Sequence, residues 1–182
     1  MLFTHDTVWS LIAAVALVNS AEEPDTMTSQ AELDAFYAEH GYTGSRSHDT
    51  AELEAVRELR APLRELLTSD RDTAVTIVNR ILAEHRAVPQ LVRHDNVDYH
   101  LHAIGTEAPL ADRIAVETAM AMIDVIRADE MSRLSVCADD ACEGIVLDLS
   151  RNRSRRFCST ACGNRNAVAA YRARKGALSG ER

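Results

Sequence analysis

All four cysteines of this 182-residue chain lie in its last 46 residues, where they form two close pairs. Four residues separate Cys137 from Cys142, fifteen separate the pairs, and three separate Cys158 from Cys162. Such spacing lets four thiolate sulfurs converge on one metal ion at about 2.3 Å. The segment around them has few large apolar side chains, and so small a unit needs a cross-link to hold a fold. The pattern predicts one structural Zn²⁺ ion bound by all four cysteines.

Two other interpretations of the cysteines stay open, namely a pair of disulfides and four unrelated thiols. An apolar run at 8–18 lacks the basic segment that begins a secretory signal, and it is shorter than the roughly 20 residues that span a bilayer. We therefore expect a cytoplasmic protein with no membrane segment, where cysteines bind metal more often than they form disulfides.

The cysteine spacing also fits an iron ion in place of zinc. A catalytic zinc is disfavoured because four protein ligands leave no position for water.

Charge is divided sharply along the chain. Residues 151–182 hold nine Lys or Arg and one acid, for a net charge of +8, which leaves −16 for the first 150 residues. A basic segment on an acidic protein indicates binding of a polyanion, and we predict DNA. The predicted contacts are the cations of one turn and of the last helix: Arg151, Arg153, Arg155, Arg156, Arg165, Arg172, Arg174 and Lys175. A solvated basic tail is the alternative interpretation, and arginines close to the cysteines are also placed to donate hydrogen bonds to thiolates.

Helical periodicity dominates the first 130 residues. It predicts helices at 8–18, from a capping box at Ser29 to Gly41, at 49–67 with a kink at Pro62, at 72–87 and at 110–128. Alternating polarity at 90–103 predicts a β-hairpin that turns at Asp95–Asn96, and a second hairpin is expected at 145–157, followed by a helix after Cys162. The predicted class is α+β: an acidic, mainly helical domain (1–130) with a β-hairpin, then a basic zinc-ribbon- or treble-clef-like module (131–182) that ends in a helix.

The helical domain offers one candidate site of its own. His94, His100 and His102 cluster on the predicted hairpin, where a second metal ion or a small acidic ligand could bind. A strand face with hydrogen-bonded histidines is the simpler interpretation. Trp9, Tyr37 and Tyr42 fit a pocket wall or, as we predict, anchors of the hydrophobic core.

Two stretches of the chain resemble known families. The first cysteine pair, "LDLSRNRSRRFCSTACGNR" and "YRARK", over 134–175, resemble the CGNR zinc finger, which is named for the run at 162–165. The acidic part, including "LVRHD" and "YHLHA", resembles the ABATE domain that usually precedes this finger. The resemblance implies a bacterial, stress-induced transcription regulator in which the four cysteines bind zinc and the finger binds DNA.

A different function class stays open beside DNA binding. The basic segment, with its fold held by zinc, could be a protein-interaction module that docks on an acidic protein surface, including this chain's own acidic domain. A homodimer is a further expectation, through an apolar face of the 8–18 helix. We expect no enzyme, because the sequence has no Gly-rich phosphate loop, nucleophile elbow or His-Glu zinc motif.

Overall fold

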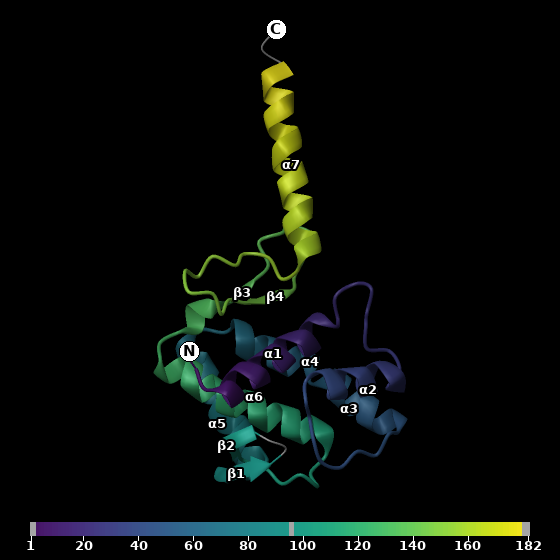
Figure 1. The fold of residues 1–182 in the computed structure, drawn as a ribbon, viewed down its shortest axis with the longest axis vertical. Helices are drawn as coiled ribbons and strands as arrows, with labels where there is room; N and C mark the ends of the chain where they lie inside the picture. The colour runs from purple at the N-terminus through teal and green to yellow at the C-terminus, as the bar shows by residue number, and fades with distance from the viewer. Residues whose placement is uncertain (1–2, 95–96, 180–182) are drawn as a thin grey trace.

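The computed structural model describes residues 3–94 and 97–179. A helical body carries a small module whose last helix projects away from it (Figure 1). The body consists of α1 (His5–Asn19), α2 (Gln30–Glu39), α3 (Thr50–Glu58), α4 (Arg60–Thr68), α5 (Arg71–Glu84), β1 (Gln90–His94), β2 (Val97–His102) and α6 (Leu110–Arg127). The module consists of the 3-10 turn η1 (Met131–Arg133), β3 (Leu134–Val136), β4 (Ile145–Leu147) and α7 (Thr160–Ser179). The predicted α+β class and the order of its parts are confirmed.

The core of the body forms around α6, which packs against α1, α3 and α5. Leu110, Ile114 and Met122 are among its fully buried side chains, and each large apolar side chain removed from water contributes about 1.5–3 kcal/mol. The capping box at Ser29 is confirmed, since its hydroxyl accepts from the Glu32 N–H and the Glu32 carboxylate accepts in return. Along the described chain, no helix is both long and apolar enough to cross a bilayer.

The buried face of α1 differs from the one that its periodicity predicts. Leu11, Leu17 and Val18 are buried, but Ile12 faces solvent, and Trp9 is 45% exposed. The prediction that Trp9 anchors the core is therefore wrong. Because α1 is apolar on nearly every side, spacing alone does not select one face; the small Ala13 and Ala14 are buried instead. Of the other two predicted anchors, Tyr42 is buried and Tyr37 is half-buried.

One predicted helix is two helices in the structure. The segment at 49–67 divides at Leu59, between α3 and α4, rather than bending at Pro62. Proline has no N–H to donate to the carbonyl four residues earlier, that of Glu58, and its ring clashes with that carbonyl. The helical hydrogen bonds resume at once, with the Leu63 N–H 2.9 Å from the Leu59 carbonyl oxygen. Pro62 thus lies in the first turn of α4, where proline is tolerated.

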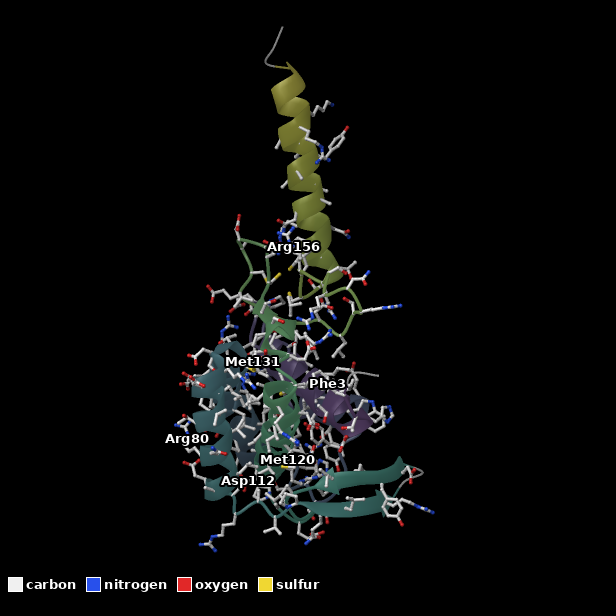
Figure 2. The ribbon with its side chains drawn as sticks, turned by 90° about the vertical axis from the view of Figure 1, so that its left-hand side faces the viewer. Phe3, Arg80, Asp112, Met120, Met131 and Arg156 are labelled. Atoms are coloured by element: carbon white, nitrogen blue, oxygen red, sulfur yellow. The ribbon has the colours of Figure 1, made fainter. Side chains whose placement is uncertain are left out.

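The two hairpins also depart from expectation. β1 and β2 pair antiparallel as predicted, and the predicted turn at 95–96 lies outside the described residues. The hairpin extends sideways from the helices (Figure 2), so that Leu91 and Tyr99 are 67% and 66% exposed. The second prediction is wrong, because β4 pairs with the upstream β3, Leu134 opposite Leu147, and not with the segment that follows it. All three residues of β4 are buried.

Candidate metal centre and basic helix

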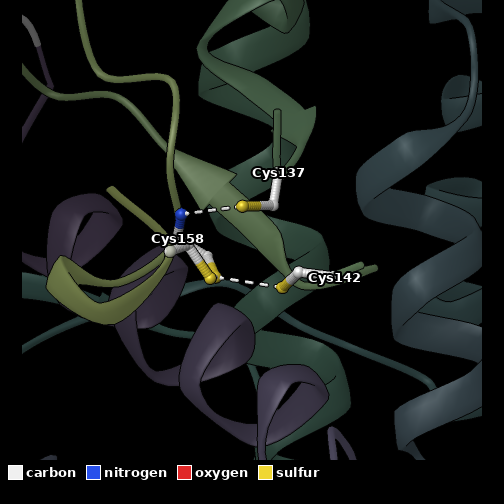
Figure 3. Close-up of side chains that lie close together, drawn as sticks. Cys137, Cys142 and Cys158 are labelled. Atoms are coloured by element: carbon white, nitrogen blue, oxygen red, sulfur yellow. Dashed lines mark hydrogen bonds between the residues drawn. The ribbon is translucent and has the colours of Figure 1, made fainter. Parts of the chain in front are cut away.

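The four cysteines converge at one point of the module. Their Sγ atoms all lie within 4.8 Å of one another. The Cys142 and Cys158 sulfurs are 3.5 Å apart (Figure 3), and those of Cys158 and Cys162 are 3.7 Å apart. A tetrahedral zinc site with bonds of about 2.3 Å has sulfur–sulfur edges of about 3.8 Å, whereas a disulfide needs about 2.05 Å. All four cysteines are free, so this cluster can hold one zinc ion.

Strand ends and a helix start position the four ligands. Cys137 follows β3, and Cys142 closes a turn in which its N–H donates to the Asp139 carbonyl over 2.9 Å. Cys162 lies in the first turn of α7, where its N–H donates to the Ser159 hydroxyl over 3.2 Å. Ser159 therefore caps α7, and the predicted helix begins before Cys162 rather than after it. The metal cluster and the start of α7 form one unit.

Hydrogen-bond donors surround the sulfurs. The Cys158 N–H lies 3.4 Å from the Cys137 sulfur (Figure 3), and the Gly144 N–H lies 3.4 Å from that of Cys142. Burial raises the pKa of the Cys142 and Cys158 thiols, while the Ser159 hydroxyl lowers the pKa of Cys162. A metal ion that binds such half-buried thiols displaces their protons. These donors then stabilise the resulting thiolates.

Gly144 shows how closely the chain wraps the cluster. A Cβ atom built on Gly144 would lie 3.0 Å from the Cys158 sulfur and 3.3 Å from the Cys158 Cβ. A side chain at this position would have to displace the Cys158 sulfur by a few tenths of an ångström, so glycine suits the close approach. A zinc site made of four cysteines fits these features: four sulfur ligands, backbone N–H groups that donate to them, and a glycine where the chain passes closest.

Three of the predicted DNA-contact arginines bond within the module or to Glu130 at its junction with the body. Arg165 donates to the Asp139 carboxylate over 2.8 Å and to the Cys162 sulfur over 3.3 Å. Arg155 donates to the Cys158 carbonyl over 3.0 Å, and Arg153 to the Glu130 carboxylate over 2.8 Å. The Ala141 N–H and the Arg165 guanidinium lower the pKa of Asp139, which stays ionised. Arg165 thus has the alternative role expected for arginines close to the cysteines, which is to donate a hydrogen bond to a thiolate.

Family comparisons agree with both parts of this description. Residues 12–129 match the model of the ABATE family, described as "Putative stress-induced transcription regulator". The chain belongs to the ABATE family. Residues 133–175, which include all four cysteines, match the CGNR zinc finger, so both resemblances are confirmed in the expected order. The comparison with curated proteins finds no match.

The CGNR finger is attached to the ABATE body through a shared core. Ile145 and Leu147 of β4 belong to the main hydrophobic core, while Val146 packs with the cysteine cluster. The Asn19 side chain, at the end of α1, donates to the Ile145 carbonyl over 2.8 Å and accepts from the Ile145 N–H over 2.6 Å. Since β4 is covered on both faces, its sequence is a continuous apolar run. The division at residue 130 into two domains stays a prediction.

The remaining predicted contacts point outward. Arg151, Arg156, Arg172, Arg174 and Lys175 are all exposed. The Arg156 guanidinium lies 5.9 Å from the centre of the Phe157 ring, and Phe157 packs on the cysteine cluster. On α7, helical spacing groups Arg172 with the exposed apolar side chains of Val168 and Tyr171. Their contact with DNA stays a prediction.

The predicted histidine site is incomplete among the described residues. The His100 and His102 Nε2 atoms are 3.0 Å apart, but the His94 side chain lies outside the described residues. Among side chains that the structure describes, the four cysteines form the one group of three or more metal-binding residues. A second metal at the histidines stays a prediction.

Four residues that shape the metal site were not predicted from the sequence: Asn19, Asp139, Gly144 and Ser159. Three of them lie within three residues of a cysteine, where turn and cap residues are common. Closeness to a cysteine in the sequence could therefore have identified these three. Asn19 is 126 residues away from Ile145 in the chain. No local pattern marks such a contact.

Proposed function

We propose that this protein is a transcription regulator whose zinc-bound CGNR finger binds DNA through α7 and the loop beneath it. One observation carries the proposal: a helix of 20 residues, anchored at its first turn by Cys162, stands clear of the body (Figures 1 and 2). Its cations Arg172, Arg174 and Lys175 are exposed. The family description of a transcription regulator supports it. A helix of that length extends about 30 Å, which is enough to lie along a major groove.

The proposed contacts divide by position. Arg172, Arg174 and Lys175 lie on the projecting part of α7 and would contact phosphates or guanine edges. Arg151 and Arg156 lie on the finger's loop, from which they would reach the adjacent backbone. Alanines on α7, exposed at 167, 169 and 170, leave room for a close approach to a groove. The arginines bonded inside the finger would orient this surface rather than bind.

Zinc has a structural role in this proposal. Four thiolates saturate the ion and leave no position for a substrate, so a non-enzymatic role is part of the proposal. The bound ion would set the direction in which α7 leaves the finger. A cytoplasmic site and a response to stress belong to the same proposal, the latter on the family description.

The test is fluorescence anisotropy with zinc-loaded full-length protein and duplexes selected from a random pool. We expect specific binding that weakens steeply with salt, because phosphate contacts release counterions. Arg172→Gln should lower the affinity about tenfold, and loss of one phosphate contact should reduce the salt slope by about 1. Arg80→Gln is the matched control, since Arg80 is an exposed arginine on α5, far from α7 (Figure 2). Equal loss in both variants, or no selected sequence, would refute the proposal.

One observation favours a second candidate, a protein-interaction module. Val168 and Tyr171 are 49% and 60% exposed beside Arg172 on α7, and a mixed apolar and basic helix face suits an acidic protein groove. Docking of the basic segment on this chain's own acidic body, and a homodimer, are forms of this candidate. Small-angle scattering at low and high salt distinguishes them, because a docked α7 shortens the particle and a dimer doubles its mass.

A further inference from the structure

A cavity of about 540 Å³ lies in the ABATE body, between α1, α6 and β2. Trp9 and Asp124 line it from the two helices, and Tyr99 lines it from the strand. Figure 2 shows the hairpin leaving the body beside Met120 of α6, another lining residue. A volume of this size accommodates a small organic molecule.

Two polar groups in this cavity lack the partners that such groups normally have. The Tyr42 hydroxyl is buried and has no hydrogen-bond partner in the described part of the chain. The Glu117 carboxyl also has no hydrogen bond among the described residues; loss of water around it raises its pKa to about 7, against the opposing charge of Arg113. Buried polar groups are nearly always hydrogen-bonded. The Tyr42 hydroxyl is such an exception, and together with the half-buried Glu117 carboxyl in the same cavity it indicates a polar ligand.

The charges of the lining select the sign of that ligand. Four carboxylates face the cavity against one guanidinium, that of Arg127. Two of the four hold the walls together: Asp124 accepts from the Thr7 hydroxyl over 2.5 Å, and Asp6 accepts from the Leu101 N–H over 3.2 Å. Of the other two, Asp98 is exposed to solvent and Glu117 is half-buried, so Glu117 is the carboxylate that gains most from a ligand. An anion would be repelled, and a purely apolar molecule would leave Glu117 without a partner.

The rim supplies the second part of the recognition. Trp9 and Tyr99 are exposed aromatic residues at the cavity, and their large apolar rings can pack against the apolar part of a ligand. We propose that this cavity binds a small organic cation with an apolar body, whose ammonium group donates to the Glu117 carboxylate and to the Tyr42 hydroxyl oxygen. The apolar part then lies against Trp9 and Met120. This site goes beyond the proposed DNA binding and does not depend on it.

Trp9 makes the test direct, because it is the one tryptophan of the chain and lies at the cavity. Phenethylamine, 2-phenylethanol and phenylacetate share one apolar body and differ in charge, and we would titrate each against full-length protein near pH 8 while recording tryptophan fluorescence. We expect saturable binding of phenethylamine, at least about tenfold tighter than that of either analogue. Equal binding of all three, or no response to phenethylamine, would overturn the proposal.

Two variants separate recognition from folding. Glu117→Gln should reduce phenethylamine affinity about tenfold and leave 2-phenylethanol unchanged, whereas Glu65→Gln, at an exposed carboxylate outside the cavity, should change neither. Tyr42→Phe removes a hydroxyl that has no partner among the described residues, so its unfolding midpoint should be unchanged or higher while phenethylamine binding weakens. If both variants bind phenethylamine as tightly as the parent, the proposed site is wrong.

Discussion

Among its described residues the chain contains two hairpins of two strands each, and the buried strand β4 of one contrasts with the exposed side chains of the other, β1–β2. Every residue of β4 is buried, between α1 on one side and the cysteine cluster on the other. In β1–β2, Leu91 and Tyr99 face solvent. A hairpin alone is marginally stable in water. We conclude that β4 anchors the finger to the body, whereas β1–β2 is a lightly supported wall of the proposed ligand cavity.

Metal removal should affect the two hairpins most differently. Structural zinc contributes an apparent 10–16 kcal/mol, on the order of measured values for small zinc modules, so a chelator should unfold β3, the cysteine loops and the start of α7. Hydrogen exchange followed by mass spectrometry should show faster exchange across 134–175 and little change in β1–β2. If the chelator leaves hydrogen exchange at 134–175 unchanged, zinc does not stabilise the fold of the finger.

Truncation of one apolar side chain in each hairpin gives the next largest contrast. Ile145→Ala leaves a cavity in the core and should lower the free energy of unfolding by about 3 kcal/mol. Leu91→Ala, at an exposed position, should change it by less than about 0.5 kcal/mol. Urea unfolding of both variants measures the difference. Similar losses would show that β1–β2 is packed in solution.

A smaller contrast concerns Glu117, which lies behind the β1–β2 hairpin. Its pKa is raised from 4.5 to about 7, so the folded state binds a proton that the unfolded state releases, and this group's contribution to stability falls as pH rises through that window. Between about pH 5 and pH 8 the ionisation of Glu117 should lower the free energy of unfolding by about 2 kcal/mol. Glu117→Gln should abolish that part of the pH dependence in urea unfolding, and Glu65→Gln should keep it. A Glu117 variant with the parent's pH dependence would show that Glu117 is solvated.

Local patterns predicted much of this molecule. Cysteine spacing identified the four residues that converge, and caps and periodicity located most helices, because these signals act over a few residues. The partner of β4 was not predictable in this way, since strand pairing and the Asn19 contact join distant segments. The apolar run of α1 likewise did not show that Trp9 would be exposed.

Charge patterning predicted a basic surface but not the role of each cation. Arg165 and Arg172 lie seven residues apart and have the same side chain, yet Arg165 is bonded to Asp139 and the Cys162 sulfur, while Arg172 is exposed farther along α7. The difference depends on where the Asp139 turn folds relative to the start of the helix. Only the three-dimensional arrangement shows which guanidinium has an internal partner.

The central claim is that four sulfurs hold one zinc ion at the base of α7. X-ray absorption spectroscopy of the purified full-length protein, together with its metal content, tests this most directly. We predict one zinc per chain, coordinated by four sulfurs at about 2.3 Å. A metal-free protein, or a zinc shell that includes nitrogen or oxygen ligands in place of any of the four sulfurs, would contradict the account.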